Sequence, residues 1–230
     1  MIVSSVDESF RTALAGHHIE LPEDQIAVLD RYCRLLWDWN AKINLTRHTD
    51  YEKFVARDIV DSLVFAEFLA SGEKVLDVGT GGGVPGIVLA ILRPDLVVWL
   101  CESVAKKARA VGDIVDKLGL GVSVLPKRAE SLLGPAKFNT LVVRAVASLK
   151  DLLTWFKPHW GDFDRLLVLK GPAWVEERGE ARHHGLMHDL ALRKLKSYPF
   201  PGTSSESVLL QICPKDRLVD DGGCRILAKK

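Results

Sequence analysis

The sequence feature that most constrains the fold is a short apolar run that ends in a glycine-rich loop and leads directly into a helix. The apolar run is Val75–Val78, and five glycines follow it at positions 79, 81, 82, 83 and 86. Glycine permits positive φ and lets the backbone approach a ligand closely, and Pro85 suits the first turn of a helix. The pattern predicts a strand–loop–helix unit that binds a ligand at the carboxyl end of its strand, as open parallel sheets do.

After residue 73 the sequence alternates between short β-branched runs and helical stretches, which predicts βαβ units in an α/β fold. Helical spacing covers residues 85–92, 104–118, 148–157 and 173–190. Only Pro199, Pro201 and Gly202 separate the last two strands, so the seven-stranded, mostly parallel sheet is expected to end in an antiparallel pair. The predicted strands are Val75–Val78, Val97–Cys101, Val122–Leu125, Leu141–Val143, Leu166–Leu169, Lys194–Tyr198 and Val208–Cys213.

The first 72 residues have helical spacing throughout and predict an N-terminal helical extension packed on the α/β core of residues 73–230. One helix opens after Pro22 and carries an apolar stripe from Ile26 to Trp37, with Pro in the first turn. A second stretch of helical spacing runs from Tyr51 to Leu69, and Gly72 follows it as a C-terminal stop.

Composition excludes several classes of protein. The chain has 230 residues, 47% hydrophobic, and a net charge of +1, so it is not predominantly disordered. Its longest apolar run, residues 86–92, stops at Arg93, short of the roughly 20 residues that cross a bilayer. The start, MIVSSVDESF, lacks a basic region before an apolar stretch, so we expect no secretory signal and no membrane association. Four scattered cysteines without a CxxC pattern indicate reduced thiols in a cytoplasmic protein.

The spacing of Gly81, Gly83 and Gly86 fits a dinucleotide-binding loop, but two neighbours argue against a diphosphate ligand. Asp77, at the end of the strand, would repel phosphate oxygens and suits an ammonium group instead. Pro85 removes an N–H donor from the helix start where an anion would sit. An oxidoreductase that uses NAD remains the alternative at this point.

Two further acids follow the next two strands and are expected at the same sheet edge. Glu102 lies 25 residues after Asp77, where a carboxylate binds ribose hydroxyls in such folds, and Glu130 follows the third strand. Several carboxylates around a glycine loop suit a nucleoside with a cationic tail, and S-adenosylmethionine is such a molecule. Taken singly, each acid is equally consistent with a helix-start carboxylate.

With these motifs in place, the chain resembles the glucose-inhibited division protein B family, also called ribosomal RNA small subunit methyltransferase G. The glycine loop alone is shared by class I methyltransferases, whereas the other blocks are more specific, and all of them occur in family order over residues 25–215. The matching blocks are Trp39-Asn40 with Asn44-Leu45-Thr46, Arg57-Asp-Ile-Val-Asp-Ser62, Asp77 to Gly86, Arg93-Pro94, Glu102-Ser103 with Lys106-Lys107, Arg144-Ala-Val-Ala-Ser-Leu149 and Leu169-Lys170-Gly171.

The resemblance implies a Rossmann-like class I methyltransferase that moves a methyl group from S-adenosylmethionine to N7 of a guanine in 16S ribosomal RNA. Its partner would be the RNA or a small ribosomal subunit particle, and the protein is expected to be a monomer. The expected cofactor-binding residues, with Asp77 and Gly81 added from the reading of the loop, are Asp77, Gly79, Gly81, Val84, Glu102, Ala129, Glu130 and Arg144. The sequence departs from the family in three places: Gly-Gly-Gly in the loop, Asp58 in place of a common His, and Glu102 in place of Asp.

Guanine N7 carries a lone pair and no proton, so its methylation requires alignment of the reactants and no general base. Arg144 and Lys170 are the candidates for a catalytic role. Arg144 is expected to contact the cofactor carboxylate or an RNA phosphate, although an ion pair at the sheet edge is the competing interpretation. Lys170, just past the fifth strand, is expected to contact substrate or to form a helix-entry turn.

The charge distribution suits a nucleic-acid partner. Residues 102–150 hold 9 basic and 4 acidic side chains, whereas residues 1–76 hold 8 and 13, so a local basic face could steer RNA phosphates. Trp37, Trp39 or Trp174 could stack on a base, although such residues more often belong to a core. Alternatives to the rRNA assignment are a class I methyltransferase acting on another RNA or a small molecule, and a non-catalytic RNA-binding module. His183, His184 and His188 lack a completing ligand, so no metal is expected.

Overall fold

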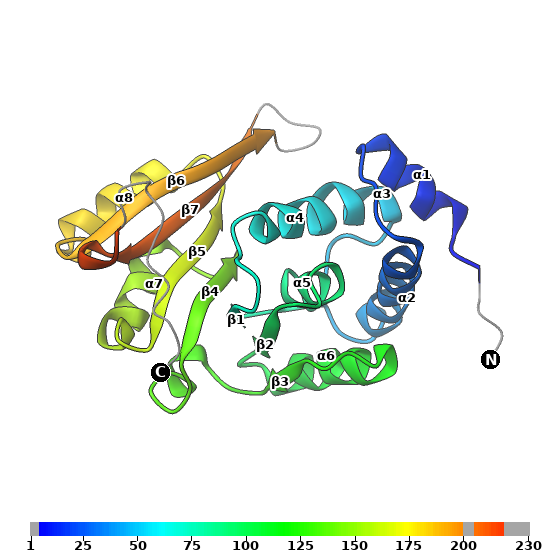
Figure 1. The fold of residues 1–230 in the computed structure, drawn as a ribbon, viewed down its shortest axis with the longest axis horizontal. Helices are drawn as coiled ribbons and strands as arrows, with labels where there is room; N and C mark the ends of the chain where they lie inside the picture. Colours follow the sequence, from blue (N-terminus) through cyan, green and yellow to red (C-terminus); the bar gives the residue numbers. More distant parts are fainter. Residues whose placement is uncertain (1–4, 200–204, 219–230) are drawn as a thin grey trace.

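A computed structural model describes residues 5–199 and 205–218, and a seven-stranded sheet runs through it in the order β3-β2-β1-β4-β5-β7-β6 (Figure 1). Each predicted strand is present, and most are longer at their ends than the apolar runs alone suggested. The strands are β1 (Lys74–Val78), β2 (Val97–Cys101), β3 (Ser123–Leu125), β4 (Phe138–Arg144), β5 (Phe163–Lys170), β6 (Leu190–Pro199) and β7 (Glu206–Pro214).

The first five strands in chain order are parallel, which brings their carboxyl ends to one edge of the sheet. Strand β1 is the middle one of these five and pairs with β2 and β4, with Asp77 opposite Leu100 and Val142. Strand β7 runs antiparallel to both β5 and β6, so the predicted α/β class with a final antiparallel pair is confirmed. Pro201 and Gly202, which are expected in the connection between the last two strands, lie outside the described residues.

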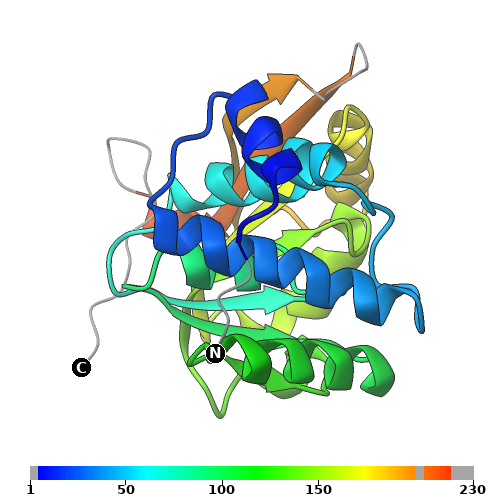
Figure 2. The ribbon, with the colours of Figure 1, turned by 90° about the vertical axis from the view of Figure 1, so that its right-hand side faces the viewer.

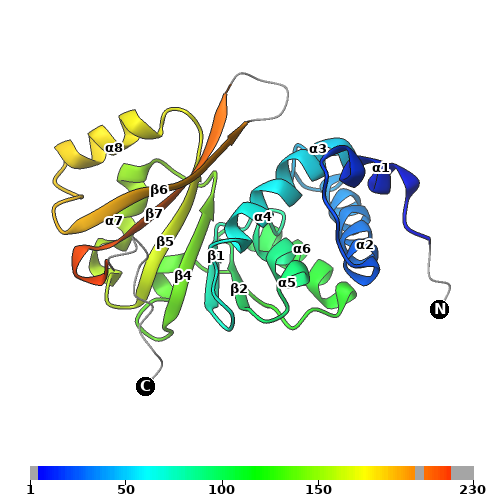
Figure 3. The same ribbon diagram turned by 45° about the horizontal axis from the view of Figure 1, so that its top comes forward.

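Helices cover both faces of the sheet, as Figure 3 shows. Helices α7 (Leu149–Phe156) and α8 (Trp174–His183) lie on one face, and α5 (Gly86–Leu92) and α6 (Ala105–Leu118) lie on the other. Capping residues set their limits: the Ser148 hydroxyl accepts from the Asp151 N–H at 3.1 Å at the start of α7, and α6 ends at Gly119 with φ of +69°. The prediction of a helix over residues 173–190 was wrong beyond residue 183, because the chain turns at Gly185 with φ of +68° before β6 begins.

Of the N-terminal helices, α2 (Glu23–Asn40) packs against α5 and α6, in front of the sheet in Figure 2, whereas α4 (Val60–Ala66) lies beside α5. The helix predicted after Pro22 is α2, and α1 (Glu8–Gly16) lies within the predicted helical extension, for which no separate helix was predicted before Pro22. The helical stretch from Tyr51 is present as α3 (Tyr51–Lys53), a π-helical segment (Phe54–Ile59) and α4 (Val60–Ala66). Such π-helical turns often occur at functional sites.

One apolar cluster joins the N-terminal helices to the sheet. Its buried members include Phe10, Leu29 and Phe54 from the first 72 residues, and Val88 and Val142 from the α/β core. A second cluster fills the opposite face beneath α7 and α8. The division of the chain at residue 72 stays a prediction.

Candidate active site

The glycine loop is anchored from within by Asp77, the last residue but one of β1. Its Oδ2 atom accepts hydrogen bonds from the Thr80 hydroxyl at 2.6 Å and from the Gly86 N–H at 2.9 Å. The first N–H group of α5 is therefore occupied by a carboxylate of the protein itself. This geometry supports the sequence argument that the loop is not built to hold a diphosphate.

Asp77 is 1% exposed, and burial raises the pKa of its carboxyl group to about 6, against the lowering effect of its two hydrogen bonds and of Arg144. Its second oxygen, Oδ1, has no hydrogen-bond partner among the described residues. A buried acceptor without a donor is unfavourable. An ammonium group could supply that donor and a phosphate group could not.

The N-terminal helices support the same loop from outside. Tyr32 of α2 donates its hydroxyl hydrogen to the Gly82 carbonyl oxygen at 2.8 Å, and burial raises the pKa of Tyr32 well above its ordinary value, so it stays a donor. The Leu45 carbonyl also faces Gly82, at 3.4 Å from the position of a Cβ there. Asn40 fixes this second contact, because its side-chain oxygen accepts from the N–H groups of Leu45 and Thr46 at 2.8 and 3.0 Å.

Three glycines of the loop, Gly79, Gly83 and Gly86, leave no room for a side chain. A Cβ on Gly86 would lie 2.0 Å from Leu100 Cδ2 and 2.7 Å from Asp77 Oδ2, which explains why α5 can pack so closely on β1. A Cβ on Gly79 would lie 2.8 Å from Val146 Cγ2, and Gly79 has φ of +66°. The loop therefore packs against the segment that follows β4.

Glu102, at the end of β2, contacts the loop from the other side. Its Oε2 accepts from the Gly81 N–H at 3.2 Å and its Oε1 from the Val104 N–H at 2.8 Å. A carboxylate has about four lone-pair sites, so two remain for hydroxyl donors. Val84, whose N–H donates to the Thr80 carbonyl at 3.2 Å, is buried in the loop.

A cavity of about 180 Å³ lies at this edge of the sheet, between the ends of β1 and β2 and the turn after β3. The structure brings three of the predicted cofactor-binding residues to it, namely Gly79, Ala129 and Glu130. The cavity is lined by Val78, Gly79, Cys101, Ser103, Lys127, Arg128, Ala129, Glu130, Val146 and Trp155. Asp77, Gly81 and Glu102 adjoin it through the glycine loop.

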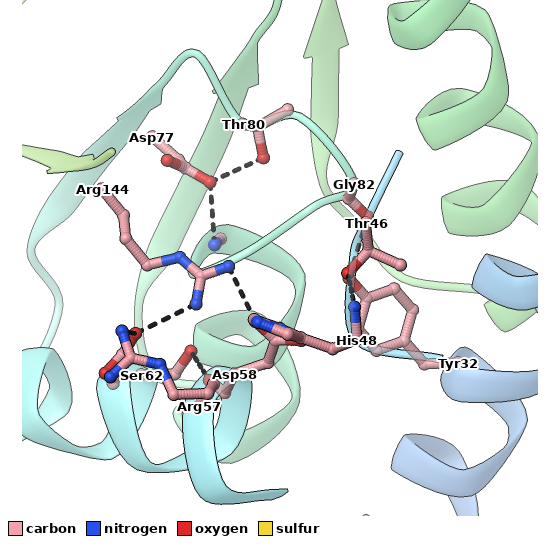
Figure 4. A network of polar contacts seen from close by, with 12 residues as sticks. Tyr32, Thr46, His48, Arg57, Asp58, Ser62, Asp77, Thr80, Gly82 and Arg144 are labelled. Carbon is pink, nitrogen blue, oxygen red and sulfur yellow. Dashed lines mark hydrogen bonds and ion pairs between the residues drawn. The ribbon is translucent and has the colours of Figure 1, made fainter. Parts of the chain in front are cut away.

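Arg144, at the end of β4, is not among the residues that line the cavity and belongs to an ion-pair network with two buried acids (Figure 4). Its Nη2 lies 2.7 Å from Asp58 Oδ1, and its Nη1 lies 3.1 Å from Asp61 Oδ2. Burial lowers the pKa of the Arg144 guanidinium, but Asp58 and Asp61 raise it more, so the net pKa is above its ordinary value. The structure therefore shows Arg144 in the sheet-edge ion pair that was the competing interpretation, while its contact with cofactor or RNA stays a prediction.

The acidic partners of Arg144 were not predicted from the sequence. Asp58 also lies 2.9 Å from His48 Nδ1, and Asp61 accepts from the Tyr198 hydroxyl at 2.6 Å. The block Arg57 to Ser62 matches the family pattern, but two acids on one helical stretch give no sign of which strand they meet. Their spacing of three residues, which places them on one helix face, was the available signal.

Lys170, the other candidate for a catalytic role, is held by protein groups. Its Nζ donates to the Ala147 carbonyl at 2.5 Å and lies 2.7 Å from Glu177 Oε2. Its side chain is 10% exposed. A contact of Lys170 with substrate stays a prediction.

The predicted basic face divides into paired and unpaired cations. Lys137 and Lys150 are paired with Asp162 and Glu180. Within the described part of the chain, no ion pair involves the other five side chains, four of which are exposed and one, Lys107, half-buried. These are Lys106, Lys107, Arg109, Lys127 and Arg128.

Two of the three tryptophans proposed for base stacking are bound within the protein. Trp37 donates its ring N–H to the His48 carbonyl at 2.8 Å, and Trp39 donates to Asp113 Oδ2 at 2.7 Å. Trp174 lies at the start of α8 with the Arg178 guanidinium 5.2 Å from its ring centre. All three rings are half-buried.

Over residues 5–199 and 205–218, no three His, Cys, Asp or Glu side chains come together as metal ligands do. In the same part of the chain, no helix combines the length and apolarity needed to cross a bilayer. Of the four cysteines, Cys33 and Cys101 are buried and free, Cys213 is buried, and Cys224 lies outside the described residues.

Comparison with solved structures identifies the fold. The chain superimposes on M. capricolum TrmK in complex with S-adenosyl-homocysteine with a TM-score of 0.54, at 12% identity, over 67% of this chain and 68% of that one. It also superimposes on a mutant of MtNAS in complex with S-adenosylmethionine with a TM-score of 0.52, at 17% identity, over 92% and 86% of the two chains. The predicted Rossmann-like methyltransferase fold is thereby confirmed.

Comparison with protein families identifies the chain more closely. The rRNA small subunit methyltransferase G (GidB) family matches residues 25–200. A ribosomal RNA small subunit methyltransferase G from Rhodopirellula baltica is 49% identical over 87% of each chain. Another from Chromobacterium violaceum is 34% identical over 88% of this chain and 95% of its own.

These matches confirm the resemblance drawn from the sequence blocks, and with it the expected enzyme class and the S-adenosylmethionine cofactor. The carboxylates that contact the glycine loop, Asp77 and Glu102, are consistent with this cofactor, since they suit a cationic nucleoside better than NAD. The chain belongs to the rRNA small subunit methyltransferase G family.

Proposed function

We propose that this protein transfers the methyl group of S-adenosylmethionine to N7 of a guanine in 16S ribosomal RNA. The observation that carries the proposal is the buried Oδ1 atom of Asp77, an acceptor without a donor among the described residues. An amino-acid ammonium group would complete it. Asp77 directly precedes Val78 and Gly79, which line the cavity. Family membership supports the choice of an RNA substrate.

The residues around the cavity fit the other parts of such a cofactor. The lone pairs left on Glu102 would accept from the ribose hydroxyls. Ala129 and Glu130, with Val146 opposite, would enclose the base. S-adenosylmethionine supplies an electrophilic methyl group when bound, and the residues of this chain bind and orient it.

The guanine base requires no deprotonation, because its N7 lone pair is already available. The protein therefore has to align N7 with the methyl carbon and sulfur, and alignment of two bound reactants can account for much of a rate enhancement. The rigid supports of the loop, Tyr32 from outside and Asp77 from within, serve this purpose. Arg144 is the last residue of β4, whose carboxyl end lies at the same sheet edge, and its side chain, paired with Asp58 and Asp61 and 19% exposed, would add a fixed positive charge there.

The unpaired cations support RNA over a small-molecule substrate. Lys127 and Arg128 line the cavity, and Lys106 and Arg109 are exposed on the adjacent helix α6. A row of unneutralised cations beside the site would attract a polyanion and release its counterions. A ribosomal particle is as suitable a partner as free RNA, and we expect a cytoplasmic location with either.

The proposal is tested by incubating the protein with tritiated S-adenosylmethionine and small-subunit rRNA, either free or in particles lacking the modification. Nucleoside analysis by mass spectrometry should then show one 7-methylguanosine per RNA. Label at an exocyclic amine or a ribose would overturn the N7 assignment. Labelling of small molecules in an extract without labelling of RNA would overturn the RNA substrate.

A further inference from the structure

The connection between β4 and α7, residues 145–148, forms one wall of the candidate cofactor cavity. Val146 lines the cavity and lies against Gly79, since a Cβ on Gly79 would be 2.8 Å from Val146 Cγ2. The position of this short connection therefore sets the width of the cavity.

This connection does not hold its shape by itself. Ala145 has φ of +54°, in the left-handed region that favours glycine. A non-glycine residue keeps such a conformation only where its surroundings impose it. The contacts that impose it here are consequently part of the site.

Two side chains outside the connection hold its far end. Glu177 of α8 accepts with Oε2 from the Leu149 N–H at 2.7 Å, and the same oxygen lies 2.7 Å from Lys170 Nζ. Lys170 in turn donates to the Ala147 carbonyl at 2.5 Å. Glu177 thus joins the ends of β5 and α7 through a single carboxylate oxygen.

We propose that Glu177 is a positioning residue for the cofactor. By fixing Lys170 and the Leu149 N–H, it holds the connection so that Val146 closes on the base of the bound nucleoside. Glu177 also caps α7 at the Leu149 N–H, beside the Ser148 cap of the Asp151 N–H, and its ion pair with Lys170 extends that contact to the Ala147 carbonyl inside the connection. The inference rests on the proposed use of this cavity for S-adenosylmethionine.

The test compares Glu177→Ala with Glu176→Ala in the full chain. Glu176 is its neighbour on the same helix turn and makes no hydrogen bond or ion pair among the described residues. We expect Glu177→Ala to raise the dissociation constant of S-adenosylmethionine, measured by calorimetry, by about tenfold. Its kcat at saturating cofactor should stay within about twofold of the unmodified protein, since the reacting atoms are not touched. Glu176→Ala should change neither quantity.

Glu177→Gln tests whether a conservative replacement restores part of the cofactor binding. It also replaces Glu177→Ala in the binding test if the alanine variant does not fold. Its amide oxygen can still accept from the Leu149 N–H but carries no charge for Lys170. The dissociation constant of S-adenosylmethionine should therefore fall between that of the unmodified protein and that of Glu177→Ala. A folded Glu177 variant that binds cofactor as tightly as Glu176→Ala would overturn the inference while leaving the proposed function intact. If the unmodified protein bound no S-adenosylmethionine at all, the proposed function itself would fail.

Discussion

The Tyr32 hydroxyl lies 2.8 Å from the carbonyl oxygen of Gly82, so a residue of the N-terminal helices directly holds a loop residue 50 positions later in the chain. Both groups are buried. The helical extension is therefore part of the architecture of the site and more than a cover for the sheet.

Tyr32→Phe should weaken this support without opening a cavity. Removing one buried hydrogen bond and leaving the carbonyl unpaired should lower the free energy of unfolding by about 1–3 kcal/mol. The looser loop should also raise the dissociation constant of S-adenosylmethionine. Tyr51→Phe is the control, since the Tyr51 hydroxyl donates to Asp30, away from the loop. Equal cofactor affinity in the two variants would show that the Tyr32 contact is only structural.

Gly86→Ala should abolish the close packing of α5 on β1. The new methyl group would meet Leu100 Cδ2 at 2.0 Å, and such overpacking costs about 1–3 kcal/mol of stability. Gly112→Ala, in the interior of α6 with nothing within 4 Å of the new Cβ, should instead add about 0.5–1 kcal/mol. Urea denaturation of both variants measures the contrast, and a stable Gly86→Ala protein would contradict the observed packing.

Arg144→Ala should destabilise the protein strongly whatever its part in the reaction. It would remove the cation that two buried carboxylates share, and loss of one partner of a buried ion pair costs about 3–5 kcal/mol. Asp61 would keep Arg57 at 3.4 Å and Asp58 would keep His48 at 2.9 Å, so we expect a loss toward the lower end of that range. Adding Asp58→Asn and Asp61→Asn should restore much of that loss. If the triple variant regains stability but not methyl transfer, Arg144 has a role in the reaction as well as in the fold.

The raised pKa of Asp77 predicts a dependence of stability on pH. Its folded pKa is about 6 and its ordinary value is 3.8, so the folded protein holds the proton more tightly than the unfolded chain. The stabilisation of the folded state by this proton is complete below pH 3.8. It is lost as the pH rises through 6, which lowers the free energy of unfolding by about 3 kcal/mol. The free energy of unfolding relative to Asp77→Asn should therefore fall between about pH 4 and pH 7.

Cofactor binding should respond to the same titration in the opposite sense. Ionised Asp77 would attract the ammonium group, so the affinity for S-adenosylmethionine should rise over that range of pH. Asp77→Asn should bind weakly at every pH. An affinity of the unmodified protein that does not change between about pH 5 and pH 7 would count against the contact of Asp77 with the ammonium group.

The unpaired cations predict how RNA binding depends on salt. Replacing Lys106 and Arg109 by glutamine should lower the slope of log affinity against log salt by about 1.5, corresponding to two lost phosphate contacts. The same change at Lys137 and Lys150, which are already paired with acids, should leave the slope unchanged. Filter binding over a series of salt concentrations distinguishes the two variants.

The alternation of strands and helices was enough to predict the sheet, because most strands after residue 73 contain a short apolar run that is separated from the next by a helical stretch or turn residues. It was not enough for helix α1, whose nine residues bury only Phe10, Ala13 and Leu14. Periodicity also overextended the last helix, since Gly185 interrupts a stretch whose polar residues carry little spacing signal.

The site was predictable only where its residues are neighbours in the chain. Asp77 and the glycines stand in one block, and their shared edge with Glu102 and Glu130 follows from the direction of parallel strands. The pairing of Arg144 with Asp61, 83 residues earlier, depends on how a helix docks across the sheet, and no local pattern encodes it. The same holds for Lys170, whose partner Glu177 belongs to the next helix.

The contact between α2 and the glycine loop limits how this enzyme can be recombined with its relatives. Gly82 or its neighbour Gly83 is in close contact with Tyr32, Leu36 and the Leu45 carbonyl. A loop transplanted from another homologue would therefore pack against side chains that fit a different loop. Chimeras that exchange the loop together with residues 32–46 should fold and bind cofactor, whereas chimeras that break between them should not.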